Sequence, residues 1–142
     1  MFAVVALTLI GCDPSASDTE NSFAEGRRLI TIGDFEGGRM KLNDYLSSSP
    51  NGAYASRAVF FHAKSHLGQG HLSSAKVAFQ DVIRRFPNSP EAHKSHYKLA
   101  LIHFLEGDTE AARKGFGDLV AVANGSLLPE AKAMLRYLTD GR

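Results

Sequence analysis

The sequence predicts an all-α protein: a right-handed α-solenoid of about three helix–turn–helix repeats with a period of 37 residues, closed by a C-terminal capping helix. Three observations predict this fold. Glycines recur 37 residues apart at Gly33, Gly70 and Gly107. Small and aromatic residues recur at the same offset, and apolar residues between the glycines follow helical spacing rather than strand alternation. The 142 residues suffice for one domain, and their 44% hydrophobic and 22% charged content is typical of a globular protein.

An apolar run opens the chain and ends at its single cysteine. Phe2 to Ile10 would rise only about 14 Å as a helix, too short to cross a bilayer. The sequence Leu-Ile-Gly-Cys at residues 9–12 resembles the lipobox of bacterial lipoproteins, in which the cysteine thiol takes a diacylglyceryl group. We therefore expect residues 1–11 to be a lipoprotein signal peptide and residues 12–18 to be a flexible tether from lipidated Cys12. This leader predicts a lipid-anchored protein of the bacterial cell envelope that faces the periplasm.

The repeat domain is predicted to occupy residues 19–142. Its repeats span about 19–52, 53–89 and 90–126, and a capping helix follows at about 127–140. Each turn glycine separates two helical patterns, because glycine adopts positive φ without a Cβ penalty. Pro50 and Pro87 follow the second helix of the first two repeats, where a proline cannot continue the helical hydrogen bonds. A cap is expected because the last repeat would otherwise expose an apolar face.

Small residues mark the expected contact between the two helices of each repeat. Ala100 and Ala112 flank the turn at Gly107, so the two backbones can approach closely, and the large Phe116 fills the adjacent space. The same three columns, 37 residues apart, hold Ala63, Ala75 and Phe79 in the second repeat and Gly26, Gly38 and Leu42 in the first.

This pattern of a small residue, a turn glycine, a second small residue, an aromatic residue and a terminal proline resembles the tetratricopeptide repeat. The family's tryptophan position holds Ser22, Val59 and His96, and its tyrosine position holds Leu29, His66 and His103. The third repeat begins with an added Ser-Pro-Glu-Ala segment, a feature similar to envelope tetratricopeptide lipoproteins such as the β-barrel assembly lipoprotein and the Tol–Pal-associated coordinator. The resemblance implies a non-enzymatic adaptor that binds a protein or peptide segment during assembly or maintenance of the cell envelope.

The resemblance also implies that the first helices of the repeats line a concave, peptide-binding groove. Its expected residues combine aromatic and aliphatic side chains with cations, which suits a partner segment carrying acidic and apolar groups. They are Phe23, Arg27, Arg57, Phe60, Lys64, Lys94, Tyr97, Leu101 and Phe104. Residues 57–98 hold seven basic and two acidic side chains, whereas the whole chain carries a net charge of only +1.

Other functions have weaker support in the sequence. His62 and His66 lie four residues apart and could share one helix face, so an envelope metal-binding protein or hydrolase using these two residues is the alternative function. No carboxylate follows His62 as in a zinc protease, and no phosphate loop or nucleophile elbow is present. We therefore predict no catalytic residues, no cofactor and no metal. A net charge near zero argues against a nucleic-acid partner.

Overall fold

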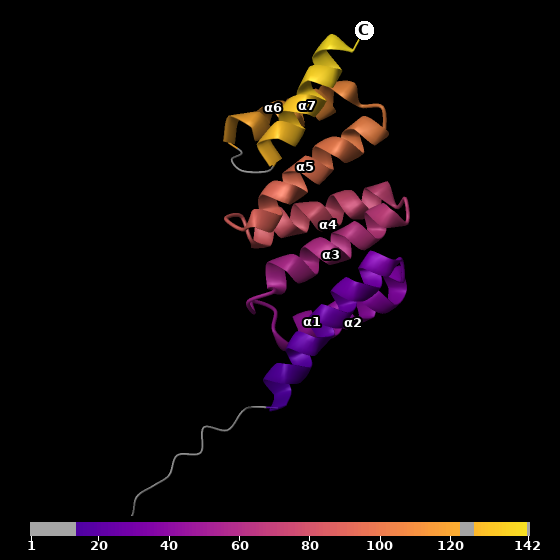
Figure 1. Ribbon diagram of the computed structural model, residues 1–142, viewed down its shortest axis with the longest axis vertical. Helices are drawn as coiled ribbons and strands as arrows, with labels where there is room; N and C mark the ends of the chain where they lie inside the picture. The colour runs from indigo at the N-terminus through magenta and orange to yellow at the C-terminus, as the bar shows by residue number, and fades with distance from the viewer. Residues whose placement is uncertain (1–13, 123–126, 142) are drawn as a thin grey trace, which may run out of the picture.

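The computed structural model describes residues 14–122 and 127–141, and within these residues all regular structure is helical. Seven helices stack into an elongated solenoid over this described part (Figure 1). They are α1 (Pro14–Ile32), α2 (Phe35–Ser48), α3 (Ala55–Gly68), α4 (Leu72–Arg85), α5 (Pro90–Leu105), α6 (Thr109–Val122) and α7 (Leu127–Asp140). The predicted fold class is confirmed. The signal peptide expected at residues 1–11 and the lipidation site Cys12 lie outside the described residues.

The first helix begins earlier than the sequence analysis expected. Residues 12–18 were assigned to a flexible tether, yet α1 starts at Pro14. Proline suits the first position of a helix because its fixed φ is helical and the amide hydrogen it lacks would have no intrahelical partner. Within the same helix, the Oγ of Ser22 donates a hydrogen bond to the Asp18 carbonyl oxygen at 3.1 Å. Most of the expected tether is therefore helical.

Each hairpin turns at a glycine with positive φ, as predicted. The φ angles of Gly33, Gly70 and Gly107 are 91°, 75° and 81°. The next helix then begins with a capping residue in two of the three hairpins: an Oδ1 atom of Asp34 accepts a hydrogen bond from Gly37 N, and that of Asp108 from Ala111 N, both at 3.0 Å. The equivalent residue before α4 is His71, whose side chain makes no cap.

Small residues let the paired helices approach closely. Ala63, Ala75, Ala100 and Ala112 are fully buried or nearly so. In the first hairpin, glycines take these positions, and a Cβ added to Gly38 would lie 2.5 Å from Ile30 Cδ1 and 3.0 Å from the Gly26 carbonyl oxygen. The α1–α2 pair therefore requires glycine where the later hairpins accept alanine.

Each hairpin of the stack also packs on the next helix. Phe79 and Phe116 are fully buried inside the second and third hairpins. Ile102 of α5 joins the core cluster of α3 and α4, and Ala131 of α7 joins that of α5 and α6. The α7 helix thus covers the apolar end of the third hairpin, the position expected for the cap.

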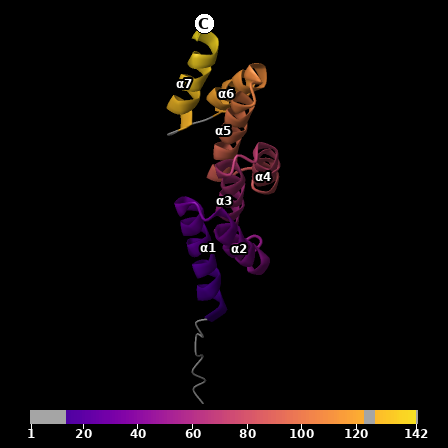
Figure 2. The same ribbon diagram turned by 90° about the vertical axis from the view of Figure 1, so that its right-hand side faces the viewer.

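The two sides of the stack differ. We call α1, α3, α5 and α7 the A helices and α2, α4 and α6 the B helices; Figure 2 shows them on opposite sides. Within the described residues, successive A helices contact one another, whereas successive B helices do not. Polar bridges at equivalent positions link neighbouring hairpins: Arg39 donates to Gln69 Oε1 at 2.6 Å, and Lys76 Nζ donates to Glu106 Oε2 at 2.8 Å.

We predict that Ala75→Leu and Ala112→Leu each destabilise the protein by about 1–3 kcal/mol, because the larger side chain has no space between the two helices. Thermal unfolding followed by circular dichroism measures this loss. Val77→Leu is the matched control, since Val77 lies on the same helix as Ala75 with 68% of its surface exposed. An unchanged melting temperature for both alanine variants would contradict the packing described above.

We also predict that Ser95→Ala stabilises the protein. Ser95 is fully buried, and its Oγ has no hydrogen-bond partner. The equivalent residue of the preceding repeat is Ala58, which is also fully buried. Removing an unsatisfied buried hydroxyl relieves a cost of about 1–3 kcal/mol, and the melting temperature should rise by about 3 °C or more. Ser47→Ala, at an exposed helical position, controls for helix propensity. A lower melting temperature for Ser95→Ala would refute this prediction.

Candidate functional site

The residues expected to line the groove do not all reach the surface. Phe23 and Phe60 are only 5% and 8% exposed. The ring of Phe23 stacks on that of Tyr54 at 4.7 Å, and the ring of Phe60 lies 5.6 Å from that of Phe79. Both rings pack mainly into the core, although Phe23 also lines the hollow described next, and their contact with a partner stays a prediction. Their burial against neighbouring aromatic rings stabilises the hairpins.

The cations of the predicted set do reach the surface. Arg27 of α1 and Arg57 of α3 lie beside a hollow of about 360 Å³. Its lining residues are Glu20, Asn21, Phe23, Ala24, Arg27, Tyr54 and Arg57. The guanidinium of Arg57 lies 5.9 Å from the centre of the Tyr54 ring. Arg27 has no ion-pair partner among the described residues.

A buried carboxylate organises the middle of this surface. Glu91, at the start of α5, is only 6% exposed, and its Oε2 accepts a hydrogen bond from Ser56 Oγ at 3.1 Å. Its Oε1 lies 3.8 Å from Arg57 Nε and 3.6 Å from Lys94 Nζ. Glu91 thus joins α3 to α5 and compensates part of the charge of two predicted groove residues.

Two further lysines have no such compensation. Lys64 of α3 lies over the Phe61 ring, with Nζ 5.0 Å from its centre, and Lys98 of α5 lies over the Tyr97 ring at 5.7 Å. Neither ammonium has an ion-pair partner among the described residues. Burial lowers the pKa of Lys64, and the positive charges of Lys98 and Lys94 lower it further. Lys94 and Lys98 therefore lie close enough to Lys64 for their charges to act on it, and we call the three residues the lysine cluster.

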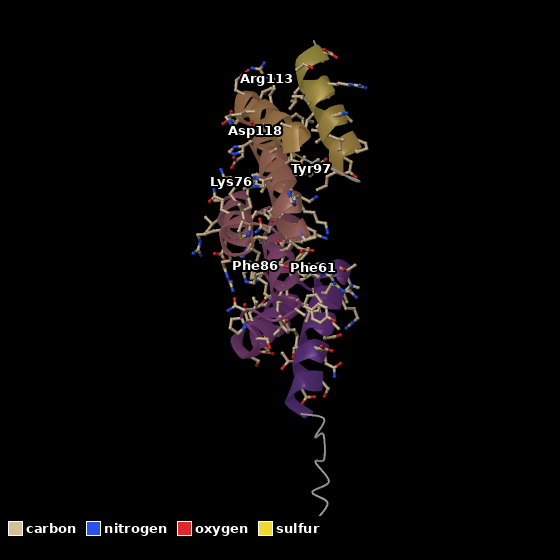
Figure 3. All side chains as sticks on the ribbon, turned by 90° about the vertical axis from the view of Figure 1, so that its left-hand side faces the viewer. Phe61, Lys76, Phe86, Tyr97, Arg113 and Asp118 are labelled. Carbon is tan, nitrogen blue, oxygen red and sulfur yellow. The ribbon has the colours of Figure 1, made fainter. Side chains whose placement is uncertain are left out.

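Aromatic rings flank the lysine cluster. Figure 3 shows Phe61 and Tyr97 on the side toward which α1 and α7 project, opposite Lys76 and Asp118. Tyr97 is half-buried and packs edge-on against Phe116 at 5.4 Å. Burial raises the pKa of its hydroxyl, and the charge of Glu130 on α7 contributes to the same shift. The neutral hydroxyl of Tyr97 can therefore donate a hydrogen bond near the cluster.

The last two predicted groove residues, Leu101 and Phe104, pack mainly at the C-terminal end of the stack. Leu101 and Phe104 are half-buried and pack into the core cluster of α5, α6 and α7. The Phe104 ring meets that of Tyr137 on α7 at 6.0 Å. The capping helix thus lies beside this end of the A-helix side.

Sequence reasoning missed Phe61 and Lys98. Phe61 directly follows Phe60. The family pattern predicts Phe60 at the surface, whereas in the structure Phe60 is buried and Phe61 is half-buried. Lys98 lies four residues after Lys94 and therefore on the same helix face. That spacing was visible in the sequence and would have identified it.

The alternative site at His62 and His66 does not form a metal-holding group in the part of the chain that the structure describes. The His62 and His66 rings lie 5.2 Å apart, but these described residues contain no group of three or more His, Cys, Asp or Glu side chains placed to hold a metal ion. No helix among the described residues has the length and hydropathy needed to cross a membrane.

Comparison with known proteins agrees with this architecture. Residues 62–129, from within α3 to the start of α7, match the family model described as Tetratricopeptide repeat. The matched part includes the lysine cluster and Tyr97, whereas α1 and α2 lie outside it. No curated protein matches the sequence. The match covers 68 of the 142 residues, and the described helices have the all-helical, stacked-hairpin architecture of a tetratricopeptide solenoid.

Proposed function

We propose that this protein is a non-enzymatic adaptor that binds an acidic segment of a partner protein at the A-helix side of its solenoid. Tetratricopeptide repeats support a role in protein–protein interaction. The observation that carries the proposal is the lysine cluster: two of its three ammonium groups lack an ion-pair partner among the described residues. Carboxylates of a bound segment would relieve their mutual repulsion.

The aromatic rings beside the cluster give the bound segment an apolar contact. Tyr97 and Phe61 are half-buried, so each offers part of a ring while the rest is held by the core. Aromatic side chains that the core already holds in place lose little conformational entropy on binding. Such residues contribute strongly to the binding free energy of interfaces. The partner segment that fits this surface carries carboxylates next to an apolar side chain.

The proposal places this adaptor in the bacterial cell envelope, held to a membrane through lipidated Cys12 and facing the periplasm. Its support is the lipobox-like sequence around Cys12, which follows an apolar run of signal-peptide length. A diacylglyceryl group with a further acyl chain would give stable anchoring, since two or more chains suffice. Assembly or maintenance of an envelope complex is the role that the resemblance to envelope lipoproteins supports.

The binding proposal predicts different effects for two substitutions. A blocked peptide of sequence Glu-Glu-Phe-Glu-Glu serves as the probe, with binding followed by fluorescence anisotropy and stopped-flow kinetics. Tyr97→Ala should weaken binding thirtyfold or more at every salt concentration, because it removes an aromatic contact. Lys64→Glu should slow association, most strongly at low salt.

Lys41→Glu is the matched charge control, because Lys41 is an exposed lysine on the B helix α2. It should leave binding within about twofold of the wild type. Circular dichroism verifies that all three variants keep their helical content. If Lys64→Glu and Tyr97→Ala both bind the probe normally, or if Lys41→Glu weakens binding as much as Lys64→Glu, the A-helix side is not the binding surface.

The anchoring proposal predicts that Cys12→Ser moves the protein from the membrane fraction to the soluble fraction of bacterial cells. Mass spectrometry of the wild-type protein should show a mature N-terminus at Cys12 with diacylglyceryl and acyl additions. Ser15→Ala, three residues later, is the control and should stay in the membrane fraction. An unmodified Cys12 in the wild type would rule out the lipoprotein proposal without affecting the binding proposal.

A further inference from the structure

The junction between the first and second hairpins carries a positive charge that no carboxylate neutralises within the bridge. Arg39 of α2 donates hydrogen bonds to Gln69 Oε1 at 2.6 Å and to Ser65 Oγ at 3.2 Å, both at the end of α3. At the equivalent place in the next junction, Lys76 Nζ donates to Glu106 Oε2 at 2.8 Å. The charge of Arg39 is therefore held by neutral oxygens, whereas that of Lys76 is held by a carboxylate.

A histidine stands beside each of these two bridges, in different surroundings. His103 Nδ1 lies 3.9 Å from Glu106 Oε2, so a protonated His103 has a carboxylate next to it. The equivalent Nδ1 atom of His66 is buried and makes no hydrogen bond. A protonated imidazole carries an N–H donor on both ring nitrogens. Protonation of His66 therefore leaves a buried donor without an acceptor, which opposes the charged form.

Two further histidines surround His66. Its ring centre lies 5.2 Å from that of His62 and 6.4 Å from that of His71. Burial lowers the pKa of both His62 and His66 below the ordinary value of 6.5. The charge of Arg39 lowers both pKa values further, as do the neighbouring imidazoles. Each proton taken up here therefore meets other positive charges.

The other helices packed on α3 offer these imidazoles little opposing charge. From α4, Asp81 lines the same hollow as His62 and His66, but its carboxylate already binds Arg84 and lies 3.4 Å from Arg85 Nη1. Both α1 and α5 also contact α3, and no charged group on their described residues shifts the pKa of either histidine. Protonation therefore adds charge to a junction that is already positive.

We propose that this junction is a pH-sensitive switch, in which protonation of His62 and His66 at mildly acidic pH loosens the docking of the first hairpin on the second. Repulsion from the imidazolium groups weakens the hold of Arg39 on the end of α3. The next junction stays docked, because Glu106 compensates both Lys76 and His103. Acid therefore releases α1 and α2 while α3 to α6 remain packed, which removes the α1 part of the A-helix side from a bound partner.

The proposal predicts that acid lowers stability before carboxylates titrate. The pKa of each of these histidines is lower in the folded than in the unfolded protein, so the unfolded chain binds more protons below pH 6.5. This stability is present above pH 6.5 and is lost as the pH falls through the folded pKa values. Urea unfolding followed by circular dichroism should give a folding constant about tenfold smaller at pH 5.5 than at pH 7.5. A decrease of less than about threefold overturns the proposal.

Gln69→Glu gives the sharpest variant, because it installs the carboxylate that the next junction carries as Glu106. It should pair with Arg39 and raise the pKa of His66, measured by NMR titration of the imidazole protons. Its folding constant should fall only about threefold or less between pH 7.5 and pH 5.5. Gln80→Glu is the matched control, since it adds the same charge at an exposed position of α4. It should keep the wild-type pH dependence. Equal pH dependence of the two variants refutes the switch.

His66→Leu removes the buried imidazole and installs the residue that the first repeat carries at this position, Leu29. Whatever its stability at pH 7.5, this variant should lose much less of it at pH 5.5 than the wild type loses. An unchanged pH dependence would exclude His66 as the sensor.

Hydrogen exchange measured by mass spectrometry shows which hairpin responds. After correction for the intrinsic pH dependence of exchange, the wild type at pH 5.5 should lose protection mainly in α1 and α2, while α5 and α6 keep theirs. Gln69→Glu should restore the protection of α1 and α2. An equal loss of protection in all helices, or a loss confined to α5 and α6, contradicts a switch at the first junction.

Discussion

The close approach of the two helices within each hairpin is the contact on which the rest of the structure depends. It requires small side chains at two facing positions, alanine in the second and third hairpins and glycine in the first. Interiors pack at nearly crystalline density, so a larger residue there forces the helices apart. The buried aromatic rings of Phe79 and Phe116 are placed by the same contact, because they fill the space that the small residues leave beside them.

The asymmetry between the two sides of the stack follows from how the hairpins meet. The A helices contact their successors, whereas the B helices of the described chain lie apart and are joined to the next hairpin only by way of an A helix. At equivalent positions, the hydrogen bonds Arg39–Gln69 and Lys76–Glu106 link the B helices α2 and α4 to the end of the A helix in the next hairpin. One side of the molecule therefore presents a row of A helices that contact their successors, and on the other side the B helices lie apart from one another (Figure 2).

Charge is also distributed unequally over the two sides. On the B helices, cations form ion pairs with carboxylates one helical turn away. These pairs are Arg84 with Asp81, Arg113 with Glu110 and Lys114 with Asp118. Such exposed pairs add little stability, but they leave little net charge at the surface. On the A helices, Glu91 compensates only Arg57 and Lys94, and Lys64 and Lys98 remain without a carboxylate partner. Four of the seven basic residues of the middle segment thus lie on the A helices α3 and α5, and the other three lie on the B helix α4.

The repeat, the turns and the small-residue contacts follow from the sequence alone, because each depends on local chemistry that recurs every 37 residues. Gly33, Gly70 and Gly107 illustrate this, since positive φ selects glycine whatever surrounds the turn. Which residues form the candidate surface was decided only by tertiary packing. Phe60 and Phe61 are chemically identical neighbours, and Phe60 is buried because it faces Phe79 of the partner helix, whereas Phe61 meets Lys64. Likewise, the charges of Lys94 and Lys98 act on Lys64 only because α3 and α5 lie side by side.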